Sequence, residues 1–404
     1  MAYIERSAEE AVRRAAREFP IVALTGPRQS GKTTLLQHLF GRSHGYRSLE
    51  LPDVRAAAAS DPRGFLALNP PPVIFDEIQH APGLLPYIKE AVDARRNRSG
   101  QFILSGSQNL LVAQGVTESL AGRVAVLKLL PLSYREIAGL PNAPLPWEPG
   151  RKARREPMAP RDLWLSFLRG GYPELVANPG RDLSLWHASY VQTYLERDVR
   201  SLRQVGDLSQ FQIFLRALAA HAAQLLNLAS LSRDLGVAVN TVKAWLSVLE
   251  ATYQVIVLRP YYGNVGKRLV KTPKLYFADL GTLCYLAGLK DPDHAMAGPM
   301  GGALFENAVL IEVLRALTHR GQEPQVYFWR TAAGVEVDFV VDAGETLVPI
   351  EVKLSTTPNP AMASGINAFK SDFGDRVAKG YIVHPGDTSL PLGPNTLALP
   401  FGTL

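Results

Sequence analysis

The hydrophobic pattern of the first third of the chain changes repeatedly between strand and helix. Ser7 and Glu10 have the spacing of a capping box, and apolar residues then recur at helical spacing up to Phe19. Alternating strands and helices are typical of a parallel sheet covered on both faces, so we expect an α/β domain. Strands are predicted at 20–25, 73–75 and 102–104, and helices at 33–40 and 84–95.

The middle of the chain has a different pattern. Residues 138–160 are rich in proline and basic residues without an apolar period, which predicts a long exposed loop or linker. Helical spacing returns over 162–223, including 185–199. Residues 228–258 then predict a helix, a turn with Gly236, a second helix and a strand, which is a helix-turn-helix pattern.

The last third resumes the alternation of helix and strand. A loop rich in glycine and proline is predicted at 291–302, followed by a helix at 303–318. The four residues 342–345 lie between two strand-like runs, so these runs are expected to form a hairpin. Strands are predicted at 326–329, 335–341, 346–354 and 380–383.

Length, charge and cysteine usage narrow the picture. A chain of 404 residues is too long for one core, so we expect two or three domains. The single cysteine, Cys284, excludes an internal disulfide and a cysteine-based zinc cage, and it fits a reducing compartment. The net charge of +6 suggests an acidic partner. The sequence has neither a signal-peptide pattern nor an apolar stretch of membrane-spanning length. We therefore expect a cytoplasmic protein that is not associated with a membrane.

A phosphate-binding loop is predicted between the first strand and the helix that follows it. The segment GPRQSGKT matches the P-loop pattern in the strand-to-helix context that this pattern requires. Its backbone N–H groups would bind phosphates, Lys32 would reach the terminal phosphates, and Thr33 would ligate Mg²⁺. We expect ATP, because no guanine-reading motif is found. The predicted contacts are Gly26, Pro27, Arg28, Gln29, Ser30, Gly31, Lys32, Thr33 and Thr34.

Two acids complete this predicted site. Asp76 and Glu77 follow the strand at 73–75, at the sheet edge where open parallel sheets bind ligands. Asp76 would hold Mg²⁺ through water, and Glu77 would act as the general base. At the end of the next strand, Ser107 or Gln108 would contact the γ-phosphate or the attacking water, or would form only a tight turn.

Several motifs together resemble a group of bacterial and archaeal AAA-like ATPases. They are TGPRQSGKTT, IFDEIQHAP, ILSGSQNLL, ESLAGRVAVLKLLPLSYREI, GGYPELV and YLERDVR. The resemblance covers nearly the whole chain and implies ATP hydrolysis in a ring-type homo-oligomer. It makes Arg123 a candidate nucleotide sensor or arginine finger, the alternative being a surface arginine near the sheet edge. Arg197 and Arg200 have the same two interpretations.

The helix-turn-helix pattern predicts contact with DNA. Asn240, Thr241 and Lys243 fall on the exposed face of the second helix, which enters the major groove in DNA-binding proteins. The alternative is a lid or a protein contact. A basic wing is predicted downstream of this helix. It consists of Arg259, Lys267, Arg268, Lys271 and Lys274, together with Tyr261 and Tyr262.

The C-terminal hairpin brings charged residues together. The period of two places Glu336, Asp338, Glu351 and Lys353 on one face, and Val335, Val337, Phe339, Val348, Ile350 and Val352 on the other. Glu336 is expected to lie opposite Glu351, and opposed acids favour a bound cation. The alternative is a solvated face with cross-strand ion pairs.

This arrangement resembles the restriction-endonuclease-like fold. The resemblance implies that Asp338 and Glu351 ligate Mg²⁺, and that Lys353 steers the nucleophile or stabilises charge. It also implies a further metal ligand from the preceding helix, for which Glu306 is the match.

Together these patterns predict a DNA-binding ATPase that couples hydrolysis to branch migration, strand separation or ATP-controlled cleavage. The alternatives are a nucleotide-controlled switch or signalling scaffold, and a Mg²⁺-dependent nuclease regulated by ATP. The predicted domains are a P-loop AAA-like domain (1–137), a linker (138–160), a helical lid-like segment (161–223), a winged-helix domain (224–290) and an α/β restriction-endonuclease-like domain (291–404).

Overall fold

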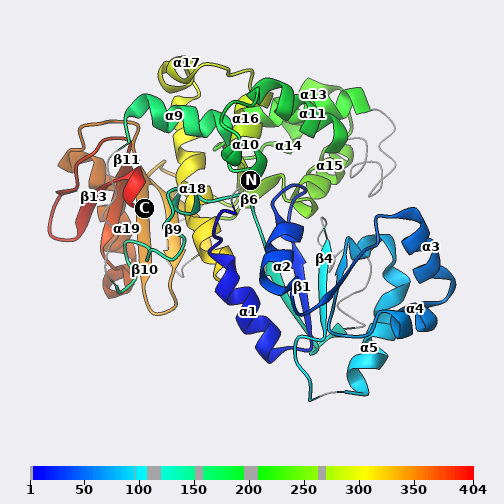
Figure 1. Ribbon diagram of the computed structural model, residues 1–404. Helices are drawn as coiled ribbons and strands as arrows, with labels where there is room; N and C mark the ends of the chain where they lie inside the picture. Colours follow the sequence, from blue (N-terminus) through cyan, green and yellow to red (C-terminus); the bar gives the residue numbers. More distant parts are fainter. Residues whose placement is uncertain (1–2, 96, 107–119, 151–157, 195–207, 263–269) are drawn as a thin grey trace. The chain divides into compact units, whose positions relative to one another are not determined.

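The computed structural model describes residues 3–95, 97–106, 120–150, 158–194, 208–262 and 270–404. They form two compact units, shown in Figure 1 and described separately below. The first unit contains Met1–Leu132, Ala251–Tyr253 and Leu317–Gln322, and the second contains Ser133–Glu250, Gln254–Ala316 and Glu323–Leu404.

The first unit is built around a five-stranded parallel sheet in the order β2-β3-β4-β1-β5. All five residues of β1 are buried, which explains its continuous apolar run. Ile21 and Ala23 pack into the core on one face, and Val22 and Leu24 pack into the core on the other. Its elements are α1 (Ala8–Glu18), β1 (Ile21–Thr25), α2 (Lys32–Phe40), β2 (Gly45–Ser48), α3 (Pro52–Ser60), α4 (Pro62–Leu68), β3 (Val73–Asp76), α5 (Leu85–Asp93), β4 (Phe102–Gly106) and β5 (Val124–Lys128).

The first part of the second unit is helical. The predicted turn at Gly236 is confirmed, because this residue ends α14 with a left-handed φ of 65°. Trp245 of α15 packs against Phe211 and Phe214 of α13, with ring centroids 5.4 and 5.3 Å apart. The elements are α8 (Tyr134–Ile137), α9 (Pro160–Arg169), α10 (Pro173–Ala177), α11 (Leu183–Tyr194), α13 (Leu208–Ala220), α14 (Leu228–Leu235), α15 (Val239–Ala251), β6 (Val255–Leu258), β7 (Lys274–Phe277) and α16 (Leu280–Leu286).

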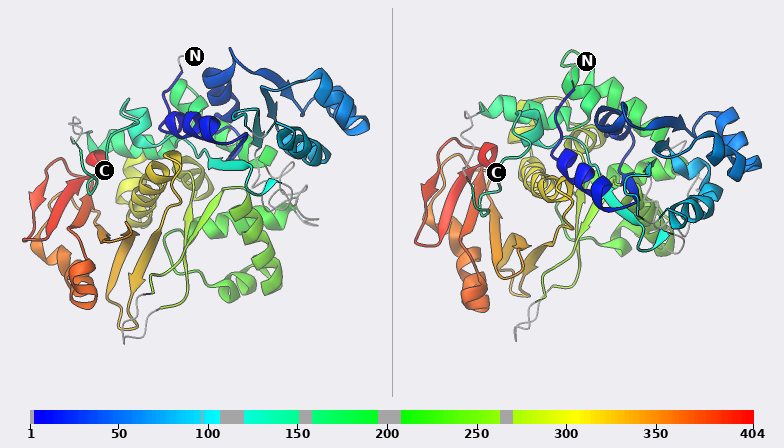
Figure 2. Two further views of the ribbon diagram at one scale, coloured as in Figure 1. Left: turned by 90° about the horizontal axis from the view of Figure 1, so that it is seen from below. Right: turned by 60° about the horizontal axis from the view of Figure 1, so that its bottom comes forward.

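The rest of the second unit is a mixed sheet with helices. The strand order is β12-β13-β11-β10-β9-β8, with β10, β11 and β13 parallel. Figure 2 shows α19 beside this sheet, where Phe369 packs on Trp329 at a centroid distance of 5.4 Å. The elements are α17 (Pro292–Ala297), α18 (Gly301–His319), β8 (Val326–Arg330), β9 (Glu336–Asp342), β10 (Leu347–Val352), α19 (Ser364–Phe373), β11 (Gly380–His384), β12 (Leu390–Pro391) and β13 (Thr396–Pro400).

Two predicted loops need correction. The segment 138–160 is not simply an exposed loop, because Leu145 is fully buried and Pro146 accepts a hydrogen bond from the Tyr381 hydroxyl. The segment 291–302 contains α17, whose first turn is capped by the Asp291 side chain. Proline at the first helical position and an aspartate cap start this helix, although it is too short for an apolar period. Among the described residues, no helix is long and apolar enough to cross a membrane.

Candidate nucleotide site and carboxylate cluster

The predicted P-loop lies at the carboxyl end of β1 and leads into α2. Gly26 has a φ of 149°, and a Cβ atom there would lie 2.1 Å from the Leu129 carbonyl oxygen. Gly31, with a φ of 92°, precedes the first helical residue, Lys32. Both glycines are therefore required by the backbone path. The N–H groups at the start of α2 are a suitable site for phosphate oxygens.

The Lys32 side chain is buried against this loop. Its Nζ donates to the carbonyl oxygens of Gly26 at 3.1 Å and Pro27 at 2.9 Å. The ammonium group is thus positioned beside the backbone that would surround a phosphate. A cation at this position compensates phosphate charge.

Asp76, at the end of β3, is held by three hydroxyl groups. Its Oδ2 accepts from Thr33 Oγ1 at 2.9 Å and from the Tyr46 hydroxyl at 2.8 Å, and its Oδ1 accepts from Ser105 Oγ. Burial, and then the Asp76 carboxylate, raise the pKa of Tyr46, so this group stays a neutral donor. Within the described residues, the hydrogen-bond donors to the Asp76 carboxylate are all hydroxyls. A carboxylate and a threonine hydroxyl beside a phosphate loop fit the oxygen ligands that Mg²⁺ prefers.

Tyr46 was missed by the sequence analysis. It lies on β2, whose residues Gly45–Ser48 alternate between exposed and partly exposed and give no apolar signal. Ser105, which directly follows the predicted strand at 102–104, was not predicted as a contact of this site. The two candidates after it, Ser107 and Gln108, lie outside the described residues, as do Arg197 and Arg200.

Glu77 follows Asp76 in an unusual backbone conformation. Its φ is 56°, which is uncommon for a residue other than glycine and recurs at functional sites. The Glu77 N–H donates to Ser105 Oγ at 3.3 Å, and its carboxylate accepts from the Gln79 side chain. This turn places a second carboxylate directly after Asp76.

Arg123 lies at the end of the same sheet that is opposite to the P-loop. It precedes β5, whose first residue Val124 pairs with Ile21, whereas Thr25 at the P-loop end pairs with Lys128. Its guanidinium forms a two-point ion pair with Asp93 at 2.7 and 3.0 Å. Arg123 therefore lies five residues of strand away from the P-loop end of the sheet, and its role as nucleotide sensor or arginine finger stays a prediction. Its position fits the alternative of a surface arginine near the sheet edge.

The predicted DNA-binding residues are only partly where they were expected. Asn240 and Lys243 are exposed on α15, Thr241 is partly exposed, and Lys271 is exposed. Lys267 and Arg268 lie outside the described residues.

Two members of the predicted basic wing belong to the core instead. Lys274 is buried on β7, and Tyr261 is buried next to the ring of Phe373. The prediction failed because β7 pairs with β6 and turns Lys274 inward. Neither residue is available to a nucleic acid in this conformation.

A carboxylate cluster surrounds Lys274. The Lys274 Nζ forms ion pairs with Glu306 at 2.9 Å and Glu336 at 2.5 Å. Glu306 also accepts from the Tyr276 hydroxyl at 2.6 Å, and Glu336 pairs with Arg330 at 3.0 Å. Burial alone disfavours the charged form of Lys274, but Glu306, Asp338 and Glu336 outweigh it and raise the pKa.

The β9–β10 hairpin adds the remaining charged groups. Phe339 pairs with Ile350, so the register places Asp338 opposite Glu351, and our expectation that Glu336 is the opposed acid is wrong. Lys353 Nζ donates to Glu351 at 2.6 Å, and Asp338 accepts from the Val352 N–H at 2.7 Å.

The pKa values of the two hairpin acids Asp338 and Glu351 are raised. The pKa of Asp338 lies well above its usual range because of burial and the nearby carboxylates of Glu306 and Glu351. Burial also raises the pKa of Glu351, although Lys353 opposes this shift. Both groups are therefore easier to protonate than an exposed carboxylate.

This cluster does not have the geometry of a metal site. Among the described residues, no group of three or more histidine, cysteine or acidic side chains is arranged to hold a metal ion. Glu306, predicted as a ligand, instead binds Lys274 and Tyr276, while Glu351 binds Lys353. The expectation that Glu306, Asp338 and Glu351 together hold Mg²⁺ is not met by this arrangement.

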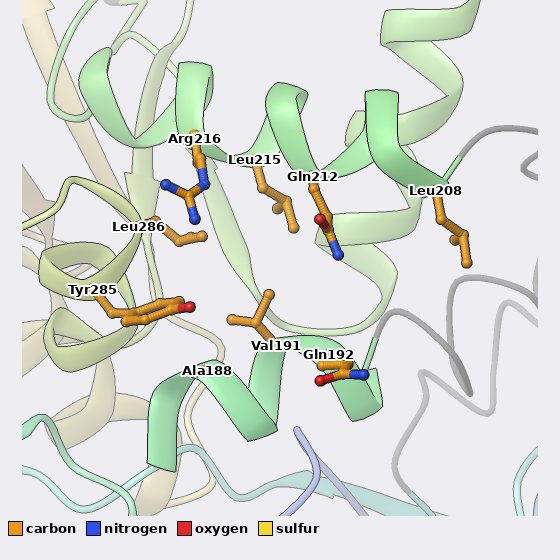
Figure 3. A pocket seen from close by; sticks show the side chains of 9 residues that line it. All are labelled: Ala188, Val191, Gln192, Leu208, Gln212, Leu215, Arg216, Tyr285 and Leu286. Atoms are coloured by element: carbon orange, nitrogen blue, oxygen red, sulfur yellow. The ribbon is translucent and has the colours of Figure 1, made fainter. Parts of the chain in front are cut away.

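A separate cavity of about 250 Å³ lies between α11, α13 and α16 (Figure 3). Its lining combines the leucines 208, 215 and 286 with the polar side chains of Gln192, Gln212, Arg216 and Tyr285. Leu208 follows directly after residues 195–207, which are not described.

Comparison with known proteins gives three matching family models. Residues 18–138 match an AAA domain, residues 160–293 match a domain of unknown function (DUF8612), and residues 301–404 match another (DUF4143). The uncharacterized proteins Rv2008c of Mycobacterium tuberculosis and Mb2031c of Mycobacterium bovis are each 31% identical over 397 residues. Each match covers 98% of this chain and 83% of the relative. The chain belongs to their family. The AAA-like P-loop ATPase domain expected from the motifs is confirmed.

Two solved structures are more distant. A Walker-type ATPase of Pyrococcus abyssi is 17% identical, with a TM-score of 0.45, covering 70% of this chain and 96% of its own. A signal transduction ATPase with numerous domains from Pyrococcus horikoshii is 10% identical, with a TM-score of 0.24, covering 79% and 49%. Similarities this low do not establish a common fold. The domain boundaries and the roles of single residues in this family member stay predictions.

Proposed function

We propose that this chain hydrolyses Mg²⁺-bound ATP at the P-loop and couples turnover to the engagement of duplex DNA by α14 and α15. The observation that carries the ATPase part is the buried Asp76 carboxylate, whose donors among the described residues are all hydroxyls, next to Lys32 and the helix N-terminus. Thr33 connects the P-loop to Asp76, because it is the last residue of the GPRQSGKT segment and its hydroxyl donates to the Asp76 carboxylate.

The residues have distinct roles in this proposal. The loop N–H groups of residues 26–34 bind phosphate oxygens, and Lys32 turns from the Gly26 and Pro27 carbonyls to the terminal phosphates. Thr33 and Asp76 would hold Mg²⁺, which supplies charge neutralisation at the phosphates. Glu77 orients and deprotonates the attacking water. Ser107 is proposed to contact the γ-phosphate.

The DNA part is supported by the arrangement of the second unit. An isolated β-bridge joins Leu225 to Lys274 of the antiparallel pair β6 and β7, and α13, α14 and α15 precede this pair in the sequence. This supports a winged helix, in which the exposed Asn240 and Lys243 of α15 face the major groove. We also propose a restriction-endonuclease-like fold for the C-terminal part, supported by Asp338 and Glu351 on adjacent strands.

A second candidate is a nucleotide-controlled switch, and one contact within the first unit favours it. The Tyr253 hydroxyl lies 3.0 Å from Thr25 Oγ1, and Thr25 directly precedes the P-loop. Tyr253 follows α15 by two residues in the sequence. A change at the P-loop would thus reach Tyr253, which lies in the turn that follows the end of α15. This candidate predicts slow turnover that DNA does not change.

The test is phosphate release by the full chain with no DNA and with duplex, forked and four-way DNA. The wild type is compared with Lys32→Ala and Glu77→Gln. We expect turnover that rises with DNA and is lost in both variants. Turnover that ignores every DNA would overturn the DNA part and support the switch. Absence of turnover in the wild type would overturn the ATPase part.

The family resemblance implies a ring-type homo-oligomer. Sedimentation of the chain with and without ATP tests this oligomer. We propose that the protein is cytoplasmic.

A further inference from the structure

Lys274 is held at the centre of the carboxylate cluster from several directions. Its ammonium is 2.9 Å from Glu306 of α18 and 2.5 Å from Glu336 of β9, and it lies 5.6 Å from the ring centroid of Phe328. Only 6% of the Lys274 side chain is exposed. Two carboxylates and an aromatic face therefore enclose this cation.

The backbone of Lys274 is fixed as firmly as its side chain. It pairs with Leu258 of β6 on one side and forms a bridge with Leu225 on the other. Tyr276, two residues later on the same face of β7, donates to Glu306 as well. The backbone from which the ammonium extends is therefore fixed by pairing on both sides.

We propose that the ammonium of Lys274 occupies the cation position of this nuclease-like centre, so that the centre holds no Mg²⁺ and cleaves no phosphodiester. The carboxyl groups of Glu306, Glu336 and Glu351 form ion pairs with three cationic groups, from Lys274, Arg330 and Lys353. The fourth carboxyl group, that of Asp338, lies opposite Glu351 in the hairpin. A divalent ion would have to approach a fixed ammonium group, which it repels.

The cluster then has a mechanical role. Lys274 belongs to the hairpin that follows the helix-turn-helix pair, whereas Glu306 and Glu336 belong to the C-terminal part. The ion pairs fasten β7 to α18 and β9 within the second unit. A buried ion pair of this kind specifies how elements pack, because any other arrangement leaves a charge unpaired.

The test measures Mn²⁺ binding to the full chain by the electron spin resonance of free Mn²⁺, without nucleotide. We expect wild type and Asp338→Asn to bind Mn²⁺ equally. Lys274→Met should gain one bound Mn²⁺ per chain, and Lys274→Met combined with Glu306→Gln should lose it again. The matched control is Lys379→Met, an exposed lysine of the same unit, which should behave as the wild type.

Two results would overturn the proposal. One is a Mn²⁺ site in the wild type that Asp338→Asn removes, and the other is Mn²⁺-dependent nicking of supercoiled plasmid that Lys353→Ala abolishes. If Lys274→Met does not fold, the comparison of wild type with Asp338→Asn decides alone, since equal binding supports the proposal and weaker binding in Asp338→Asn refutes it. ATP turnover of the same samples separates this outcome from any failure of the proposed ATPase.

Discussion

The two units each bury carboxylates that the sequence predicts as metal ligands, but the partners of these carboxylates differ. Asp76 accepts hydrogen bonds from the neutral hydroxyls of Thr33, Tyr46 and Ser105. Glu306, a predicted ligand, and Glu336, which was not predicted as one, share the ammonium group of Lys274. A metal ion can replace hydroxyl donors without leaving a charge unpaired, whereas replacing a buried ammonium leaves that cation without its partners. The two sites therefore differ in their capacity to bind a metal ion because of the charge of the nearest hydrogen-bond donor, and not because of the number of acids.

The strongest test of the first site is Lys32→Ala. Because the missing ammonium group would stabilise charge that develops in the transition state, we expect ATP turnover to fall by about 10²–10³-fold. Phosphate release under saturating Mg²⁺ and ATP measures it. Lys89→Ala, in α5 of the same unit, is the control and should keep wild-type turnover. Equal turnover in Lys32→Ala would break the assignment of this loop as the nucleotide site.

The strongest test of the second site is the stability of Lys274→Met. Removal of the ammonium leaves Glu306 and Glu336 without their buried partner, so we expect the unfolding free energy to fall by about 3–5 kcal/mol. All 5 tryptophans of the chain lie in the second unit, so tryptophan fluorescence in urea reports this unit alone. Lys379→Met should change stability by less than about 0.5 kcal/mol.

The same measurement sharpens the contrast between the units. Asp76→Asn alters the first unit and should leave the tryptophan transition of the second unit unchanged. A loss of less than about 1 kcal/mol in Lys274→Met, comparable to an exposed pair, would mean that the ion pairs are solvated and do not fasten the strand.

Much of the first site was predictable from sequence because its signals are local. The glycines of the P-loop, Lys32, Thr33 and the pair Asp76 and Glu77 are defined by their neighbours along the chain. Tyr46 was not predictable, since it reaches Asp76 from a short polar strand that pairs with β3 only in the folded sheet. Contacts of this kind depend on strand order, which no local pattern encodes.

The second site was misread for a related reason. Lys274 follows Lys271 in a basic segment, so local charge favoured an exposed wing. One signal pointed the other way: in the strand KLYF the period of two puts Lys274 and Tyr276 on one face, and both contact Glu306. The faces of the C-terminal hairpin were predicted correctly, but the register that opposes Asp338 to Glu351 depends on the turn.

A smaller effect is expected from Tyr46→Phe. The substitution removes one of three hydroxyl donors to Asp76 and preserves the ring, so the loss is about 1 kcal/mol, or about fivefold in turnover. If Tyr46 positions Asp76 for Mg²⁺, kcat falls and the Mg²⁺ concentration for half-maximal turnover rises, while KM for ATP is unchanged. Loss of stability with unchanged Mg²⁺ dependence would reduce Tyr46 to a structural role.

The smallest effect tests the proposed DNA interface on α15. Lys243 is exposed on α15, so Lys243→Ala should weaken duplex binding uniformly across sequences and reduce the slope of log affinity against log salt by about 1. Fluorescence anisotropy over a range of salt concentrations measures the slope. Ser247→Ala, one turn further along the same helix, is exposed and uncharged and should leave the slope unchanged. An unchanged slope in Lys243→Ala would remove α15 from the DNA interface. The Tyr253 contact with Thr25 would then favour a switch, because it connects the end of this helix to the P-loop without any role for DNA.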